Sequence, residues 1–257
     1  YMRAKDWAAE DPELNRYGNV ETDLRISDVV RGLQFSDDEE QANDFRKLNA
    51  DTSLIPVPFK PLAADLEINF LPALRYASNH PLAGNTLAEP GINRISAPTI
   101  SGVANTTTGY STAFIDATIK PNTYWNRTEV MNIWVCQISG GILGYAQFPG
   151  GASATDGVVI DDNAFGTTGT VSAPFNKGRT ATHEIGHWLN LRHIWGDANC
   201  GNDQVSDTPL HNTANYGCPA AGHKSTCTGK PIEMTMNYMD YSDDACMYMF
   251  SAGQKTR

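Results

Sequence analysis

The sequence predicts a mixed α+β fold, built from strands and helices around one core. Three observations predict it. Short apolar stretches typical of strands recur through the first three quarters of the chain, and a strongly helical stretch covers residues 177–191. From residue 196 onward the sequence is rich in loops and holds four of the five cysteines. Because 40% of the 257 residues are hydrophobic, the chain can form a sizeable core.

The elements before this helix are predicted from residue periodicity. Residues 36–50 are expected to form an amphipathic helix, with Ser36 as its N-cap and acidic residues in its first turn. Residues 65–71 alternate between polar and apolar side chains, which predicts a strand. Residues 111–116 and 131–138 are also predicted to be strands, the second of them strongly apolar.

A Gly-rich stretch and two capping residues organise the rest of the chain. Residues 140–151 are typical of an exposed edge strand, along which an extended peptide can add itself as a further strand. Residues 157–161 predict another short strand. The helix over 177–191 is expected to take Asn176 as its cap, and a last helix is expected to begin near Ser251.

The charge pattern excludes two classes of protein. The formal net charge is −10 and lysine and arginine form no block, so a nucleic-acid-binding surface is not expected. No apolar run reaches the roughly 18 residues that a membrane-spanning helix needs. The excess of acidic residues fits a solvated surface with calcium sites.

The cysteines indicate an oxidising compartment. Cys200, Cys218, Cys227 and Cys246 lie in loop-like sequence without a C-x-x-C pair, which favours disulfides over metal ligation and predicts a secreted protein. Four cysteines allow three pairings, and spacing alone does not choose among them. Cys136 lies in an apolar run and is expected to be a buried free thiol.

The motif HEIGHWLNLRH at 183–193 carries the chemistry. Residues four apart share one face of a helix, so His183 and His187 can bind one zinc ion. Glu184 is offset by one residue, so its carboxylate can polarise a zinc-bound water and accept its proton. His193 is the expected third ligand, which requires the helix to end and the chain to turn back. Asn190 suits that turn because Asn tolerates left-handed backbone better than most residues.

This motif, followed by NYMDYSDDACM at 237–247, resembles the pappalysin family of metzincin metallopeptidases. The resemblance covers residues 36–257. It implies a metzincin-like zincin in which a twisted sheet and helices, to about residue 193, stand above a loop-rich lower subdomain over 194–257, with the active-site cleft between. Residues 1–35 are expected to be an N-terminal extension that resembles the tail of a pro-segment.

The sequence departs from the family at two places. The glycine that usually follows the second histidine is Asn190 here, so the turn is expected to be slightly strained. The family's long apolar first strand has only residues 28–33 as a counterpart. The chemistry of the motif is unaffected by either departure.

The resemblance also implies roles for residues of the lower subdomain. Met239 would form a hydrophobic floor below the zinc, and Tyr241 would stabilise the oxyanion. Asp244 would lie at the base of the pocket that receives the residue after the scissile bond. An acid there favours cleavage before arginine and, less well, lysine. The implied disulfides are Cys200–Cys227 and Cys218–Cys246.

Two further binding sites are predicted. The loop at 201–209 gathers hard oxygen donors, so calcium is expected there. The predicted calcium ligands are Asp203, Asp207, Thr208 and the carbonyl of Val205; an ordinary Asx-rich turn is the alternative. The substrate is expected to pair with the main chain of the rim strand, at Gly141, Leu143, Gly144 and Ala146.

Together these features predict a secreted, monomeric, zinc-dependent endopeptidase that acts on proteins and peptides. A non-catalytic binding or adhesion module stabilised by calcium and zinc is the alternative, with the acidic residues of 203–207 as its binding site. The presence of Glu184 argues against that alternative. Another metzincin branch is disfavoured by the methionine turn and the cysteine spacing.

Overall fold

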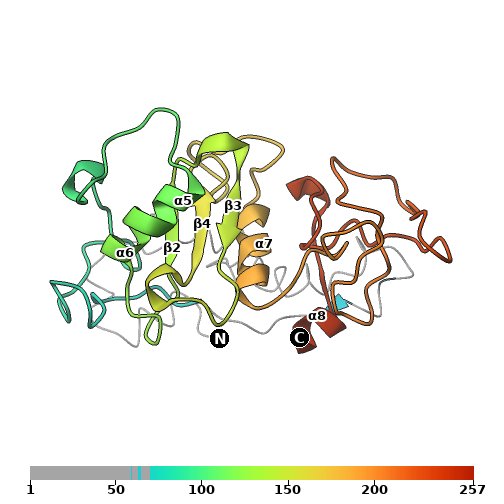
Figure 1. The fold of residues 1–257 in the computed structure, drawn as a ribbon, viewed down its shortest axis with the longest axis horizontal. Helices are drawn as coiled ribbons and strands as arrows, with labels where there is room; N and C mark the ends of the chain where they lie inside the picture. The colour runs from blue at the N-terminus through green and yellow to red at the C-terminus, as the bar shows by residue number, and fades with distance from the viewer. Residues whose placement is uncertain (1–58, 60–62, 65–69) are drawn as a thin grey trace.

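The computed structural model describes residue 59, residues 63–64 and residues 70–257 (Figure 1). The predicted extension over 1–35 and the predicted helix over 36–50 lie outside these residues, as does the apolar stretch at 28–33. Most of the predicted strand over 65–71 lies outside them too, and its last two residues are not in a strand.

A three-stranded sheet forms the centre of the first part of the structure. It consists of β2 (Ile133–Cys136), β4 (Val158–Asp161) and β3 (Gly144–Ala146), in the order β2-β4-β3. Strand β4 runs parallel to β2 and antiparallel to β3. All four residues of β4 are buried, as its apolar, β-branched composition requires of a central strand. The predicted strands over 131–138 and 157–161 are confirmed, and β3 lies at the edge of the sheet, as expected.

The predicted strand over 111–116 is wrong, because this stretch begins a helix. It comprises α5, the π-helical turn η4, and α6 (Thr112–Phe114, Ile115–Ile119 and Lys120–Thr123). The side chain of Ser111 accepts a hydrogen bond from the Phe114 N–H and so caps its first turn. The buried residues Ile115 and Ile119 are four apart, a helical spacing that the short window of alternation hid.

The long helix α7 (Arg179–Trp188) carries the zinc motif and lies between the sheet and the loop-rich C-terminal part (Figure 1). Its N-cap is Gly178, in left-handed conformation and without a side-chain cap, so the prediction of Asn176 as cap is wrong. After α7 the backbone of Asn190 has a φ of 80°, which is the left-handed turn that the motif required.

The two faces of β4 explain why the fold has helices on both sides. Val158 and Ile160 pack with Ala181 and Ile185 of α7, whereas Val159 packs with the apolar side chains of η4. Successive side chains of a strand point to opposite faces, so one buried strand serves two hydrophobic clusters. The mixed α+β class is therefore confirmed. No helix in the described part of the chain is long and apolar enough to cross a membrane.

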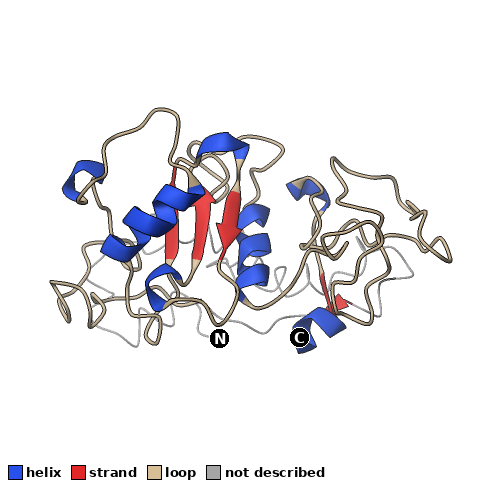
Figure 2. Cartoon of the chain, in the orientation of Figure 1, coloured by secondary structure: helices blue, strands red, loops and turns tan. Residues whose placement is uncertain are grey.

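The C-terminal part is mostly loop (Figure 2). Its regular elements are η7 (Asp244–Cys246), β5 (Phe250–Ser251) and α8 (Ala252–Thr256), and β5 pairs with the short strand β1 (Ala63–Ala64). Ser251 begins α8 as predicted, in a capping box with Gln254. Three further 3-10 turns lie earlier in the chain: η3 (Ala97–Thr99), η5 (Ser139–Gly141) and η6 (Ser153–Thr155).

Two disulfides cross-link these loops. They join Cys200 to Cys227 and Cys218 to Cys246, with Cα–Cα distances of 5.7 Å in both, which is the pairing that the family resemblance implied. Cys136 is free, but it is half-buried rather than buried. Burial raises the pKa of its thiol to about 11, so the group is protonated at neutral pH.

Candidate metal centre

The structure brings His183, His187 and His193 together. One ring nitrogen of each lies within 4.8 Å of the others, and this is the one such group of His, Cys, Asp or Glu among the described residues. His183 and His187 lie one turn apart on α7, and the left-handed turn at Asn190 returns the chain so that His193 faces them.

Each imidazole is oriented by a hydrogen bond at its other nitrogen. The Nδ1 atoms of His183 and His187 lie 2.7 Å from the carbonyl oxygens of Tyr238 and Leu191. The Nδ1 of His193 lies 2.5 Å from a carboxylate oxygen of Asp197. A carbonyl oxygen can only accept, so Nδ1 of the first two rings carries the hydrogen, and their Nε2 lone pairs are free for a metal.

The spacing and protonation of the rings fit zinc. The Nε2 atoms of His187 and His193 lie 3.1 Å apart. Two nitrogens bound to one tetrahedral zinc at about 2.0–2.1 Å lie about 3.3 Å apart. Burial lowers the pKa of His183 well below its usual value and that of His187 to about 4, so both rings are neutral at neutral pH, as metal ligation requires.

Glu184 lies beside the histidines and is 7% exposed. Its side chain packs against Gly144 of β3, where an added Cβ would meet the Glu184 Cγ at 2.9 Å and the Val159 carbonyl oxygen at 3.0 Å. Burial raises the pKa of the Glu184 carboxyl to about 8. A cation held by the three histidines would favour its charged form. The Glu184 carboxylate is not part of the group of side chains whose ligand atoms lie within 4.8 Å of one another.

Met239 packs directly under α7. A Cβ added at Gly186, between the two helical histidines, would meet the Met239 sulfur at 2.4 Å, and Met239 is fully buried. The Met239 carbonyl accepts a hydrogen bond from the Ile194 N–H, 3.0 Å away, next to the third histidine. The methionine turn therefore contacts both segments that carry the histidines, which supports its expected place as a floor.

Tyr241 lies over the metal position. Its hydroxyl is 3.1 Å from the Nε2 of His193, and its ring centroid is 5.5 Å from that of His183. Trp195 stacks on His193 at 4.3 Å and contacts the Tyr241 ring edge-on at 4.8 Å. Burial raises the pKa of Tyr241 to about 12, so its hydroxyl keeps its hydrogen at neutral pH.

Asp244 is 3% exposed and lies at the N-terminal end of α7. Its Oδ2 accepts hydrogen bonds from the Lys177 N–H at 2.7 Å and the Arg179 N–H at 3.3 Å. Burial is the main cause that raises the pKa of this carboxyl, and these N–H groups and the Arg179 charge oppose it. Asp244 thus supports the zinc helix through one oxygen.

The predicted calcium ligands separate into two groups. The Thr208 hydroxyl lies within 3.0 Å of both Asp203 carboxylate oxygens and of the Val205 carbonyl. Asp207 turns instead to α8, where it accepts hydrogen bonds from the Ser251 hydroxyl and the Gly253 N–H. Three of the four predicted ligands are therefore gathered in one loop.

The rim strand presents alternate backbone groups outward. The Leu143 carbonyl accepts a hydrogen bond from the Asp161 N–H of β4, and the Gln147 N–H donates one to the carbonyl of Gly157, directly before β4. Because backbone groups alternate along an antiparallel edge strand, those of Gly144 and Ala146 point away from β4. Leu143 is one of the residues predicted to pair with substrate, but its carbonyl is already hydrogen-bonded to β4. Gly141 precedes the strand in left-handed conformation.

Sequence reasoning missed two neighbours of the histidines. Asp197 orients His193, and its spacing of four residues was the available signal. Phe148, just beyond β3, places its ring centroid 5.2 Å from that of His187 while remaining 43% exposed. Phe148 lay within the predicted edge strand over 140–151, but nothing in its neighbours indicated contact with a histidine.

Two histidines a helical turn apart, a third after a left-handed turn and a buried methionine beneath them are the arrangement typical of zinc metallopeptidases of the metzincin class. The family model Peptidase_M43, described as "Pregnancy-associated plasma protein-A", matches residues 114–257. The chain belongs to this family, the pappalysins.

Named relatives agree with this assignment. The chain is 43% identical over 135 residues to an extracellular metalloprotease of Verticillium alfalfae and 39% identical over 132 residues to extracellular metalloprotease 1 of Coccidioides posadasii. These alignments cover 50% and 49% of this chain, and only 48% and 47% of those relatives. The chain thus spans about half their length.

Solved structures match a larger share of the chain. Mature mirolysin of Tannerella forsythia in complex with a cleaved peptide has a TM-score of 0.75 and 39% identity, over 91% of this chain and 82% of that chain. Promirolysin of the same organism has a TM-score of 0.74 and 39% identity, over 91% of this chain and 72% of that chain. These matches confirm the metzincin fold.

The contact between Gly186 and Met239 yields a test of the metal site. In Gly186→Ala the new methyl group would meet the Met239 sulfur, and overpacking of this kind costs about 1–3 kcal/mol. We expect a lower free energy of unfolding by chemical denaturation and a lower zinc content after dialysis.

The matched control removes the sulfur. Gly186→Ala combined with Met239→Ala should be less destabilised than the sum of the two single variants, because the second change makes room for the first. Additive losses would contradict the proposed contact.

Proposed function

We propose that the chain is a secreted zinc-dependent endopeptidase that hydrolyses internal peptide bonds of proteins. The observation that carries the proposal is the set of three imidazoles whose ring nitrogens lie within 4.8 Å of one another, with Glu184 buried beside them. The named relatives described as extracellular metalloproteases support both the activity and the secretion.

The residues around the metal position have distinct roles in this reaction. Zinc, when bound by the three histidines, supplies a Lewis acid for a water molecule and the scissile carbonyl. Glu184 accepts the proton that the attacking water loses and delivers it to the departing amine, so that water is consumed and a carboxyl and an amino terminus form. The Tyr241 hydroxyl donates a hydrogen bond to the carbonyl oxygen as negative charge develops there.

Two variants test this assignment. Glu184→Gln keeps the shape of the side chain but cannot accept the proton, so casein cleavage should fall to background while zinc remains at about one per molecule. Tyr241→Phe should lower kcat by about 100-fold, in line with the loss of one oxyanion donor, with little change in KM. Both are measured by peptide hydrolysis alongside metal analysis. Full activity of Glu184→Gln would refute the proposal.

The substrate pairs with the outward edge of β3. Gly144 and Ala146 offer their main-chain groups there, and Gly144 lies against Glu184, so a peptide on this edge passes the catalytic carboxylate. This main-chain pairing does not depend on side chains. Specificity must therefore come from other contacts.

Ala146→Pro removes one outward N–H without removing a bond to β4. The loss of one hydrogen bond of about 1–1.5 kcal/mol should raise KM for a long peptide by roughly 5- to 10-fold. Ala146→Gly retains the N–H and should leave KM close to that of the parent protein. Circular dichroism and melting temperature report whether the fold is intact, and equal KM values for the two variants would count against pairing at this position.

Asp244 gives a preference for arginine, and less for lysine, after the scissile bond. One oxygen of its buried carboxylate is bonded to backbone N–H groups, which leaves Oδ1 to meet a substrate cation. A buried carboxylate attracts a cation more strongly than an exposed one, and arginine can add hydrogen bonds of fixed geometry.

The preference is measured as the ratio of two kcat/KM values that are determined on the same protein. Asp244→Asn should reduce the ratio of kcat/KM for an arginine peptide to that for a leucine peptide by about 30-fold or more, the equivalent of 2 kcal/mol. A ratio cancels any loss of folded protein. Asp243→Asn removes the same charge one residue earlier and should leave the ratio unchanged. Retention of the arginine preference in Asp244→Asn would disprove this pocket.

Calcium binds in the loop of Asp203 and Thr208. One hydroxyl hydrogen cannot satisfy both Asp203 oxygens and the Val205 carbonyl at once, although all three lie within 3.0 Å of the Thr208 oxygen. Oxygens crowded in this way are stabilised by a hard cation. Asp207 lies close in sequence and can contribute only a lone pair not used at α8.

Calcium should therefore stabilise the protein by linkage. Removal of calcium with a selective chelator should lower the melting temperature, and added calcium should restore it in a concentration-dependent way. In Asp203→Asn the response should shift to higher calcium concentrations because one ligand charge is lost. An identical melting temperature with and without calcium would contradict the site.

A further inference from the structure

Tyr216 is the most exposed of the large hydrophobic side chains in the described part of the chain, at 74%. Its ring centroid nevertheless lies 6.1 Å from that of Tyr241, whose hydroxyl is 3.1 Å from the Nε2 of His193. An apolar ring so open to water contributes little to folding. Its place beside the metal centre therefore calls for another explanation.

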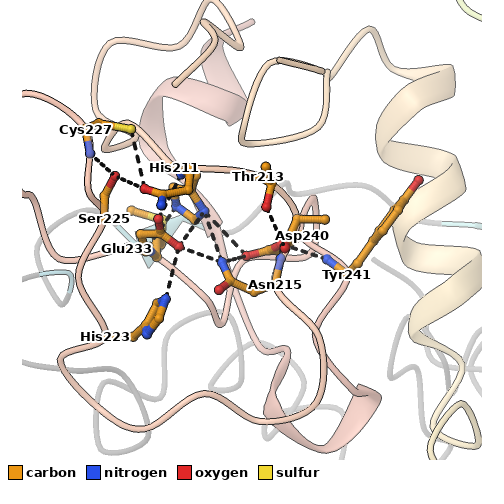
Figure 3. Close-up of polar contacts among 12 residues, drawn as sticks. His211, Thr213, Asn215, His223, Ser225, Cys227, Glu233, Asp240 and Tyr241 are labelled. Carbon is orange, nitrogen blue, oxygen red and sulfur yellow. Dashed lines mark hydrogen bonds and ion pairs between the residues drawn. The ribbon is translucent and has the colours of Figure 1, made fainter. Parts of the chain in front are cut away.

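The backbone on both sides of Tyr216 is anchored. The N–H of Asn215 donates to Asp240 at 2.8 Å, and its side-chain amide donates to Asp240 at 2.9 Å and to Glu233 at 2.7 Å (Figure 3). On the other side, the carbonyl of Gly217 accepts a hydrogen bond from the Asp243 N–H at 2.9 Å. The ring is thus exposed because its backbone is held there.

The anchor is a buried polar network. Glu233 and Asp240 are 2% and 0% exposed, and both carboxylates face the fully buried ring of His211, whose Nδ1 lies 3.7 and 3.5 Å from them. The Nε2 of His211 accepts the Met234 N–H, so Nδ1 carries the ring hydrogen toward the carboxylates. Moving Asn215 would leave buried carboxylate oxygens without a donor, which is costly.

The same network holds Tyr241. Asp240 follows Met239 in the chain, and its Oδ1 accepts the N–H of Tyr241 as well as that of Asn215 (Figure 3). One carboxylate therefore sets the positions of two tyrosines relative to the methionine floor. The loop of Tyr216 is also tied to the turn of Asp244, through the Asp243–Gly217 hydrogen bond and the Cys218–Cys246 disulfide.

We propose that Tyr216 is a specificity-determining residue that contacts a substrate side chain on the C-terminal side of the scissile bond. The side is indicated by its ties to the Asp243–Cys246 turn. A rigid aromatic ring binds at little entropic cost, and its face favours a planar or cationic side chain, arginine above all. Asn215 acts as its positioning residue. The inference rests on the proposed peptidase function, and the choice of side rests on the proposed Asp244 pocket.

The experiment compares Tyr216→Ala, Tyr216→Phe and Leu210→Ala in a peptide library read by sequencing the new N-termini. Leu210 is an exposed apolar residue of the same subdomain, at 41%. Tyr216→Ala should weaken selectivity at one of the first three positions after the cut by about 3- to 10-fold in kcat/KM. Tyr216→Phe should retain that selectivity, and Leu210→Ala should match the parent protein.

A second readout distinguishes direct contact between Tyr216 and the substrate from an indirect effect on the structure of the protein. Because the ring is exposed, Tyr216→Ala should keep the melting temperature and zinc content of the parent. Asn215→Ala should lower the melting temperature and weaken selectivity at the same position, and adding Tyr216→Ala should weaken it no further. Unchanged selectivity in Tyr216→Ala, or a change confined to positions before the cut, overturns the inference.

A third readout distinguishes failure of the inference about Tyr216 from failure of the proposed function. Binding of an arginine-containing library peptide is measured by fluorescence anisotropy for two zinc-loaded proteins. One carries Glu184→Gln alone, and the other carries Glu184→Gln together with Tyr216→Ala. If the parent protein does not cleave peptides, the proposed function fails, and a 3- to 10-fold weaker binding still supports the contact. If the parent protein cleaves but Tyr216→Ala binds equally well, only this inference fails.

Discussion

The orientation of the three imidazole rings is the constraint on which the site depends. Each Nδ1 lies against an oxygen from a different segment: Tyr238 before the methionine, Leu191 after the zinc helix, and Asp197 beyond the third histidine. The metal position therefore exists only when α7, the left-handed turn and the methionine turn are assembled. Zinc binding is expected to be coupled to folding of the methionine turn and the loops around it for the same reason.

Close backbone contacts support this arrangement from above and below. Gly144 lets Glu184 lie against the rim strand, and Gly186 lets Met239 lie against the helix. In both places the absence of a side chain allows a functional group to approach where a Cβ would collide. The helix is thus fixed between β3 and Met239, and the position of the Glu184 carboxylate follows from this packing.

Three buried carboxylates hold together loops of the C-terminal part of the chain. Glu233, Asp240 and Asp244 are nearly inaccessible to water, and each accepts hydrogen bonds from backbone N–H groups. Such groups are tolerated because fixed donors replace the lost hydration. They compensate for the scarcity of regular structure there, since they join loops that neither a sheet nor a long helix connects. The two disulfides also join loops in this region and so stabilise it further.

The sequence by itself determined the zinc motif and the strands over 131–138 and 157–161, because local spacing and strongly apolar runs express these directly. It also indicated the left-handed turn at Asn190. The place of Met239 below the histidines came only from the family resemblance. Local patterns misled at 111–116, where a short alternating window concealed a helical spacing, and at Asn176, where a distant aspartate rather than a local cap serves the helix. Only the tertiary structure decided which oxygens hold the imidazoles, that Asp207 serves α8, and that Tyr216 stands exposed beside the site. The contacts of His183 with Tyr238 and of Asp207 with Ser251 join residues 55 and 44 apart in the chain, so no local pattern could carry them.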